Sequence, residues 1–196
     1  MPTGVALPNA RERLFAAAER VLARDGLGAV TSRAVTAEAG VAKGVMHRHF
    51  ADFDAFLAEL ILDRVAALAV PAQTLRDAVG RGDISDNLAD VLAAVFDPVA
   101  VAVVALVITR DRLRARLRDA GAARFPLITE ASAMVREYLR AEQALGRVAA
   151  SADIAALAPT LIGATHLLFT DREGAATDRA ALGRVVATVM RGVAPT

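Results

Sequence analysis

The chain has 196 residues, 55% of them apolar, with no Cys, no Trp and few aromatic residues. The absence of Cys excludes disulfides and thiolate metal sites, and an apolar content rich in Ala favours helices over sheets. No charged segment followed by an apolar one marks a signal peptide, so the protein is expected to be cytoplasmic.

The charge is balanced overall and unevenly distributed. The net charge at pH 7 is +1, yet residues 1–50 hold seven basic and four acidic residues, against sixteen and eighteen in the rest of the chain. A basic front joined to a mildly acidic body permits DNA binding without proving it. The longest apolar run, residues 91–108, is interrupted by Asp97-Pro98 and is shorter than a membrane span of about 20 residues, so it predicts a buried helix.

The first fifty residues predict three helices, which cover about residues 9–25, 31–39 and 42–49. Asn9 followed by Glu12 suits the start of the first helix, and Thr31 suits the start of the second. Gly40 supplies a tight turn between the two short helices.

The remaining sequence continues with apolar residues at helical spacing. The pattern predicts helices over residues 52–71, 88–95, 98–117, 126–145, 153–169 and 178–190. Asp52 caps the first of these, and Pro71 ends it. The fold class expected is therefore all-α, with about nine or ten helices.

The most informative stretch is residues 31–57, TSRAVTAEAGVAKGVMHRHFADFDAFL. Two short helices, a Gly-Val turn and an apolar plug at Phe50 have the build of a helix-turn-helix. In such a motif the second helix inserts its N-terminal residues into the major groove, where base edges can be distinguished. This stretch therefore predicts DNA binding.

The same stretch resembles the signature of the tetracycline-repressor (TetR) family of regulators. The matching positions are Thr31, Ala37, Ala39-Gly40-Val41, Lys43-Gly44, Met46 and His49-Phe50. The likeness covers roughly residues 9–60, and the remainder resembles the family only in being helical. It implies a helix-turn-helix DNA-binding domain over residues 1–51 and a helical domain for effector binding and dimerisation over residues 52–196.

The resemblance also implies which residues contact DNA. Thr31, Lys43 and His47 fall at phosphate-contacting positions, and those at groove or neighbouring backbone positions are Ser32, Arg33, Gly44, Val45 and Arg48. The chemistry of the residues agrees, because Arg33 can fork onto guanine and Gly44 allows close backbone approach. Lys43, the only Lys in the chain, sits where a helix N-terminus favours phosphate.

Three positions depart from the family pattern. The usual Tyr is His47, the usual capping Ser is Ala42, and the Lys that commonly opens the next helix is Phe53. Each change removes a hydroxyl or a charge that the family points at DNA. We therefore expect a modest DNA affinity, or one that varies with pH because the imidazole of His47 can gain a proton.

Several conspicuous residues have ordinary structural interpretations. Phe50, Phe53 and Phe56 are expected to pack in the core. His47 and His49 are not expected to bind a metal, because no carboxylate or Cys completes a ligand set. Arginines alternate with other residues from 110 to 118, which scatters them around a helix; a solvated helix end is expected there, with a contact to phosphate or an anionic ligand as the alternative.

The C-terminal half carries more apolar surface than one monomer core needs. The helices near residues 126–145 and 153–169 are expected to form a two-fold four-helix interface, and the resemblance implies the same. Polar groups that interrupt the apolar helices predict an effector pocket formed by Phe96, Thr109, Met134, Tyr138, Thr165 and His166. Because no acidic cluster lies in those stretches, a neutral or weakly polar hydrophobic effector is expected, and no cofactor.

The function that follows is a ligand-responsive dimeric regulator, a repressor of a palindromic operator that a small molecule releases. The alternative is a helical adaptor that has lost sequence-specific DNA binding. An enzyme is not expected, because the sequence has no nucleophile with its base, no glycine-rich phosphate loop and no metal-ligand spacing.

Overall fold

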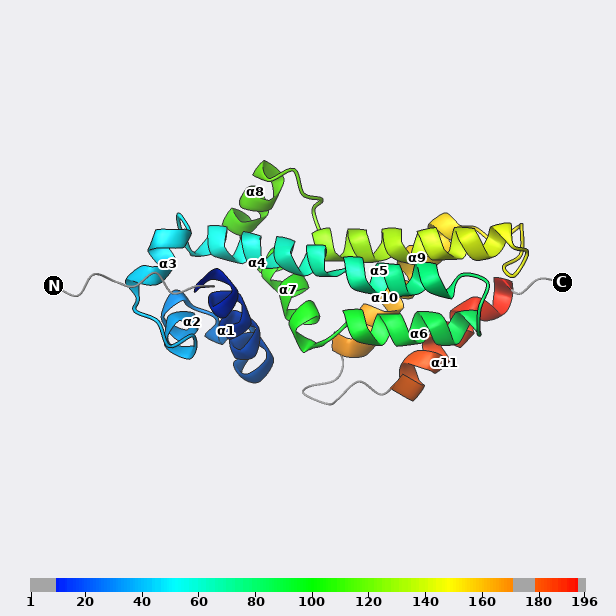
Figure 1. Cartoon of the computed structure of the whole chain (residues 1–196), viewed down its shortest axis with the longest axis horizontal. Coiled ribbons are helices and arrows are strands. Elements are labelled where there is room, and N and C mark those ends of the chain that lie inside the picture. Colours follow the sequence, from blue (N-terminus) through cyan, green and yellow to red (C-terminus); the bar gives the residue numbers. More distant parts are fainter. Residues whose placement is uncertain (1–9, 171–178, 194–196) are drawn as a thin grey trace.

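The computed structural model describes residues 10–170 and 179–193, and within these the regular structure is all helical (Figure 1). The α-helices are α1 (Ala10–Asp25), α2 (Ser32–Glu38), α3 (Gly44–His49), α4 (Phe53–Ala67), α5 (Ala69–Ala78), α6 (Ile84–Val95), α7 (Pro98–Thr109), α8 (Asp111–Asp119), α9 (Pro126–Ala144), α10 (Ile154–Thr170) and α11 (Arg179–Met190). Short 3₁₀ helices cover Leu27–Ala29 and Arg191–Val193. The predicted all-α fold class is confirmed.

Two predicted helices are each divided. The helix expected over residues 52–71 ends at Ala67, and α5 then begins at Ala69 and carries Pro71 in its first turn, where a missing N–H is tolerated. The helix expected over residues 98–117 is broken at Arg110, which has an extended backbone with φ −122° and ψ 102°. The predicted starts at Asn9 and Asp178 lie outside the described residues.

Aspartate side chains begin four of the helices, among them α10, where Asp153 accepts from the N–H of Ala156 at 3.1 Å. Asp52, Asp83 and Asp97 each accept a hydrogen bond from the backbone N–H three residues later, at 2.7, 3.0 and 2.6 Å. Such caps satisfy one of the free N–H groups in the first helical turn. The caps fix where α4, α6 and α7 begin.

The molecule is elongated, with α1, α2 and α3 at one end and the longer helices of the bundle at the other (Figure 1). We call residues 10–50 the head and residues 69–170 with 179–193 the body. α4 runs from the head into the body, so the position of the head depends on this one helix and on what packs against it.

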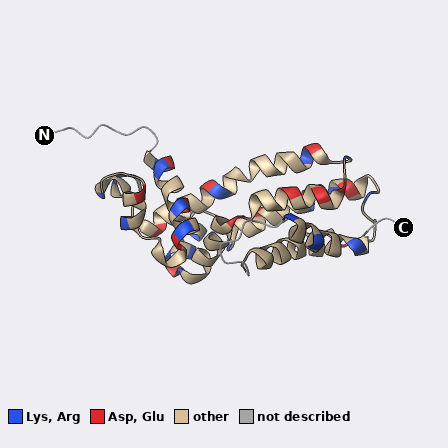
Figure 2. Cartoon of the chain, turned by 90° about the horizontal axis from the view of Figure 1, so that it is seen from below, with Lys and Arg blue, Asp and Glu red and all other residues tan. Residues whose placement is uncertain are grey.

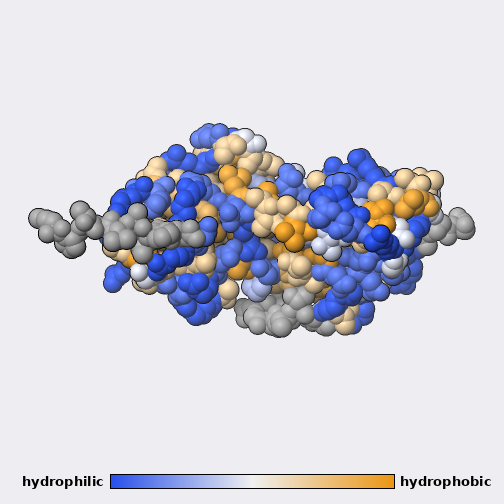
Figure 3. All heavy atoms as spheres, viewed as in Figure 1, coloured by the Kyte–Doolittle hydropathy of each residue, from blue (hydrophilic) through white to orange (hydrophobic). Residues whose placement is uncertain are grey.

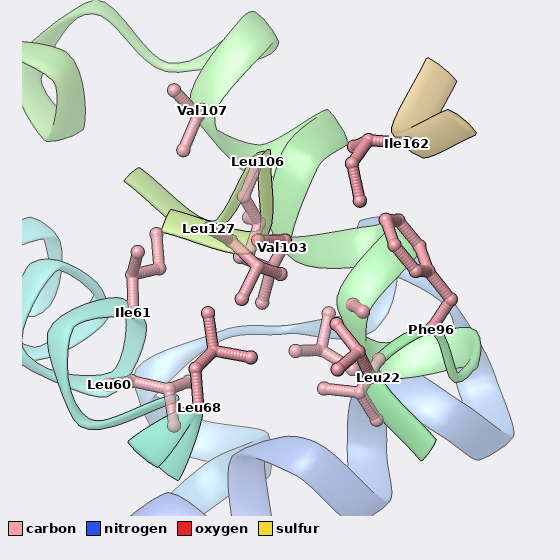
Figure 4. Close-up of a cluster of buried hydrophobic side chains, with 14 of the residues drawn as sticks. Leu22, Leu60, Ile61, Leu68, Phe96, Val103, Leu106, Val107, Leu127 and Ile162 are labelled. Atoms are coloured by element: carbon pink, nitrogen blue, oxygen red, sulfur yellow. The ribbon is translucent and has the colours of Figure 1, made fainter. Parts of the chain in front are cut away.

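One hydrophobic core joins the head to the body. Leu22 of α1 belongs to the same buried cluster as Leu60 of α4, Val103 of α7 and Leu127 of α9. Figure 4 shows side chains from these helices directed toward one another, with Phe96 and Ile162 at one side. Because the head shares this core, a rearrangement of the body helices changes what α1 packs on.

Among the described residues, no single helix is long and apolar enough to cross a membrane. α6 and α7 taken together are long and apolar enough, but the chain bends by 66° between them. Both helices contribute buried residues to the core, as the apolar run over residues 91–108 predicted.

Candidate nucleic-acid interface

The turn between α2 and α3 is set by a few local hydrogen bonds. Thr31 caps α2 by accepting from the N–H of Ala34 at 3.1 Å. Gly40 has φ +63°, the left-handed conformation that glycine adopts at low cost, and the next N–H, that of Val41, donates to the Thr36 carbonyl at 3.0 Å. This ends α2 and directs the chain into α3, as a helix-turn-helix requires.

Burial separates the packing residues of the motif from its outward-facing ones. Val35, Ala39, Val45, Met46 and Phe50 are buried in the head. The predicted contact residues that are exposed are Thr31, Arg33, Lys43, Gly44, His47 and Arg48. Ser32 is half-buried, and its hydroxyl has no hydrogen-bond partner in the described part of the chain.

Val45 does not share this exposed position. It is 5% exposed and belongs to the hydrophobic core, so its side chain packs inside the head and does not face outward. The resemblance placed it among groove contacts by its position near the start of α3. Burial of an apolar β-branched side chain on the inner face of a short helix is the physical reason for the difference.

The cations of the head fall into two groups. Those of α1 are engaged: Arg11 pairs with Glu59, Arg13 donates to the Ala39 carbonyl at 2.7 Å, and Arg20 and Arg24 pair with Glu38 at 2.7 and 3.0 Å. The two arginines hold the pKa of the Glu38 carboxyl below its ordinary value. Arg33, Lys43 and Arg48 have no ion pair with any described residue. The unpaired positive charge of the head therefore lies on α2, α3 and the turn between them (Figure 2).

An aromatic cluster packs against the end of α3. The Phe50 ring lies 5.0 Å from that of Phe56 in an edge-on arrangement and 5.9 Å from that of Phe15. Phe53 stacks on Phe56 at 5.6 Å. The expectation that Phe50, Phe53 and Phe56 pack is confirmed, although Phe53 is only half-buried. The cluster fixes the end of α3 to α1 and α4.

The joint between head and body carries an ion triad that the sequence did not indicate. Arg64 of α4 donates to Glu19 of α1 at 2.7 Å and to both oxygens of Asp97 at 2.9 and 3.0 Å. The Arg64 side chain is 17% exposed. The partners lie 45 and 33 residues away along the chain, so no local spacing could have identified them.

The predicted effector residues do not gather around one space. Phe96 and Thr165 are fully buried, and the Phe96 ring lies 6.3 Å from the half-buried ring of His166. Thr165 Oγ1 and His166 Nδ1 are buried atoms without a hydrogen-bond partner among the described residues. Burial also lowers the pKa of His166. Thr165 and His166 therefore have unused hydrogen-bonding capacity, and the Phe96 ring lies near that of His166.

The other three predicted effector residues lie elsewhere. Thr109 is exposed at the end of α7 and donates to the Ala105 carbonyl at 2.9 Å, so its hydroxyl already has an acceptor within the helix. Tyr138 accepts from the Asn87 amide at 2.9 Å, and burial raises its pKa to about 12. Asn87 lies on α6, and Phe96 caps the end of the same helix nine residues later, so the two residues are about 13 Å apart. Tyr138, which contacts Asn87, therefore lies away from Phe96. Met134 is buried one turn from Tyr138 on α9.

Two larger cavities are lined by described residues. One, of about 350 Å³, adjoins the ion triad between head and body; its wall includes Glu19, Arg64, Leu68, Pro71 and Val95. The other, of about 370 Å³, lies at the far end of the body beside Asp83 and Arg147. None of the six predicted effector residues lines either cavity.

Residues 14–60 match the family model described as bacterial regulatory proteins, tetR family. The match covers α1 from Leu14 onward, α2, α3, the turn between them and the first part of α4. No curated protein matches the chain.

Solved structures similar to this one span nearly the whole chain. A transcriptional regulator from Rhodococcus sp. Rha1 has a TM-score of 0.69 at 21% identity, with 94% of this chain and 98% of that one covered. E. coli NemR in its reduced form has a TM-score of 0.69 at 17% identity, with 94% and 97% covered. A member of the TetR family from Streptomyces coelicolor A3 has a TM-score of 0.63 at 23% identity, with 93% and 99% covered. At these identities the likeness establishes the fold.

Proposed function

Because this chain is a member of the tetR family of bacterial regulatory proteins, with a helix-turn-helix DNA-binding domain, we propose that it is a dimeric, ligand-responsive repressor of a palindromic operator. The observation that carries the proposal is the exposed, unpaired set of Arg33, Lys43 and Arg48 on the helix-turn-helix. Cations that are not neutralised by protein carboxylates remain available to phosphates and guanine edges.

The proposed contact set follows from exposure. Thr31, Lys43 and His47 contact phosphate, and Arg33, Gly44 and Arg48 reach the groove or the adjacent backbone. Ser32 is half-buried and its unpartnered hydroxyl oxygen is buried, so it joins this set only if its side chain turns outward. Residues 1–51 form the DNA-binding domain of the proposal, and residues 52–196 form the effector-binding and dimerisation domain.

Two copies must pair for two recognition helices to reach half-sites about one helical turn apart. The outer face of α10 supports this pairing, because Pro159 and Gly163 are exposed and Leu167 is 69% exposed. α9, the other helix expected at the interface, exposes the charged Glu130, Glu137 and Arg140. We therefore centre the two-fold interface on α10 and take α11, which exposes Ala187 and Thr188, as its neighbour in place of α9.

Effector release would act through α4. A small molecule that binds among Phe96, Thr165 and His166 can use their unsatisfied polar atoms, and Phe96 is the cap residue directly before Asp97 of the ion triad. A shift there changes the packing of Arg64 and Glu19, and with it the angle of the head. A preference of about 1–3 kcal/mol for the non-binding state is enough to lower operator occupancy measurably.

The test measures binding of the protein to duplexes that cover the DNA upstream of its own gene, at two salt concentrations. We expect tight, salt-sensitive and sequence-selective binding, lost by more than tenfold in Lys43→Gln and Arg48→Gln. Arg76→Gln on α5, an exposed arginine far from the head, is the matched control. Weak binding that is indifferent to sequence would favour the adaptor.

The dimer is tested separately by sedimentation. Leu167→Glu places a charge in the proposed interface and should convert a dimer to a monomer. The same change at the exposed Leu145, at the end of α9, should leave the mass unaltered.

A further inference from the structure

α8 packs against α4, the helix that follows the recognition helix α3 (Figure 1). Leu113 and Leu117 are its buried residues. Arg116 donates to the carboxylate of Asp52 at 2.6 Å, and Asp52 follows Phe50, the residue that ends α3, by two positions. This body helix therefore reaches the junction between α3 and α4, three residues after the recognition helix.

The arginines of α8 lie on two flanks of the helix. With Leu113 and Leu117 facing inward, a rotation of 100° per residue places Arg112 and Arg116 on one flank. Arg114 and Arg118 fall on the other flank. Because Arg116 contacts Asp52, the flank that it shares with Arg112 faces the cap of α4, in the short connection that follows α3.

Most of these arginines are already engaged. Arg110 pairs with Asp54 at 2.8 Å and lies over the Phe53 ring at 5.5 Å. Arg114 pairs with Asp111 and donates to the Val107 carbonyl at 2.7 Å. Arg112 and Arg118 are exposed and have no ion pair within residues 10–170 or 179–193. Figure 3 shows hydrophilic residues over the outer end of α8.

We propose that α8 is a second DNA-contacting element, in which Arg112 binds a backbone phosphate beside the half-site that α3 reads. The inference rests on the proposed function and extends it, since it gives the body a direct contact with DNA. A guanidinium on the head-facing flank with no protein carboxylate to neutralise it fits a phosphate, and such a contact adds affinity without sequence preference. Arg118, with the same charge and exposure on the opposite flank, makes no such contact.

The experiment measures the Kd of the full-length protein for two 40-base-pair duplexes across a salt series. One duplex comes from the DNA upstream of its own gene and the other has a random sequence. Arg112→Gln and Arg118→Gln remove the same charge from the same helix, so the second is the control for the first. Melting temperatures for both variants should equal that of the wild type, because neither side chain has a partner in the described structure.

We expect Arg112→Gln to reduce the slope of log K against log salt by about one per protomer on both duplexes. At 0.1 M salt this corresponds to a loss of about tenfold per contact. The loss should disappear when the upstream duplex is trimmed to the half-sites, because the flanking phosphates are then absent. Arg118→Gln should keep the wild-type slope.

Equal slopes for Arg112→Gln and the wild type, or equal losses for the two variants, would overturn the inference and leave the proposed function intact. A wild-type protein that binds neither duplex in a salt-dependent way would instead refute the proposed function.

Discussion

Arg64 of α4 donates to Glu19 of α1 across 2.7 Å, and its second amino group holds both oxygens of Asp97 at the start of α7. One side chain on the connecting helix thus ties the DNA-binding head to the body. Burial works against the charge of Arg64, but the two carboxylates outweigh it and raise its pKa above the ordinary value. The triad is the most direct polar link through which a change in the body can reach the head.

Replacing Arg64 with Gln should destabilise the protein. The change leaves two part-buried carboxylates close together without their cation, and since these are 34% and 41% exposed, we expect a loss of about 1–3 kcal/mol in the free energy of unfolding. Urea denaturation measures it. Glu59→Gln is the control, because it removes an exposed ion pair between the same two helices and should cost less than about 1 kcal/mol. Equal losses would show that burial of Arg64 adds nothing.

Glu142 fixes the far end of the body. Its fully buried carboxylate accepts from the Gly80 N–H at 3.1 Å and from Arg147 at 2.9 and 3.2 Å. Glu142→Ala leaves the guanidinium and the N–H without this acceptor, which predicts a loss of about 2–4 kcal/mol. Glu137→Ala on the exposed side of the same helix should change stability by less than about 0.5 kcal/mol. A small effect at Glu142 would mean that water replaces its contacts.

His166 should make stability depend on pH. Burial lowers its pKa in the folded protein below the ordinary value of 6.5, so the unfolded chain binds the proton more readily. Stability is then fully present above about pH 6.5 and is lost as the pH falls through the folded-state pKa. Melting temperatures of the wild type and His166→Asn, compared between pH 7.5 and 5, should diverge at the acid end, with the wild type losing more. If the melting temperatures of the two proteins fell equally between pH 7.5 and 5, the imidazole of His166 would not be buried in its neutral form.

The helix-turn-helix could be predicted from the sequence because its determinants are local. Thr31, Gly40 and the apolar residues at helical spacing act within a few positions of one another. The division of the long helices could not be predicted in this way. Arg110 leaves helical geometry where its guanidinium pairs with Asp54, which is 56 residues away along the chain. Tertiary contacts of this kind override local helix propensity.

The effector residues show the same limit on the predictions. Thr109 interrupts an apolar helix and so seemed to face a pocket, but its hydroxyl is satisfied by the carbonyl four residues earlier. Tyr138 is satisfied by Asn87, which lies 51 residues away. A polar residue in an apolar stretch identifies a group that needs a partner, and only the fold decides which partner it finds.

The two glycines of the motif should respond differently to Ala. Gly40 has φ +63°, where an added Cβ meets no close contact but the backbone itself is strained, so Gly40→Ala should cost about 1 kcal/mol or more of stability. Gly44 begins α3, and nothing lies within 4 Å of the position that its Cβ would take. Gly44→Ala should therefore fold at least as stably as the wild type.

DNA binding separates the two variants further. If the backbone at Gly44 approaches DNA closely, the extra methyl group must collide with it, and Gly44→Ala should lose operator affinity by tenfold or more while its melting temperature is unchanged. Gly40→Ala should lose affinity only in proportion to its loss of folded protein. Calorimetric melting together with Kd measurements on the same duplex makes the comparison. A Gly44→Ala variant with wild-type affinity would show that the backbone at Gly44 does not approach DNA closely, and would leave the contacts to the side chains of Lys43, His47 and Arg48.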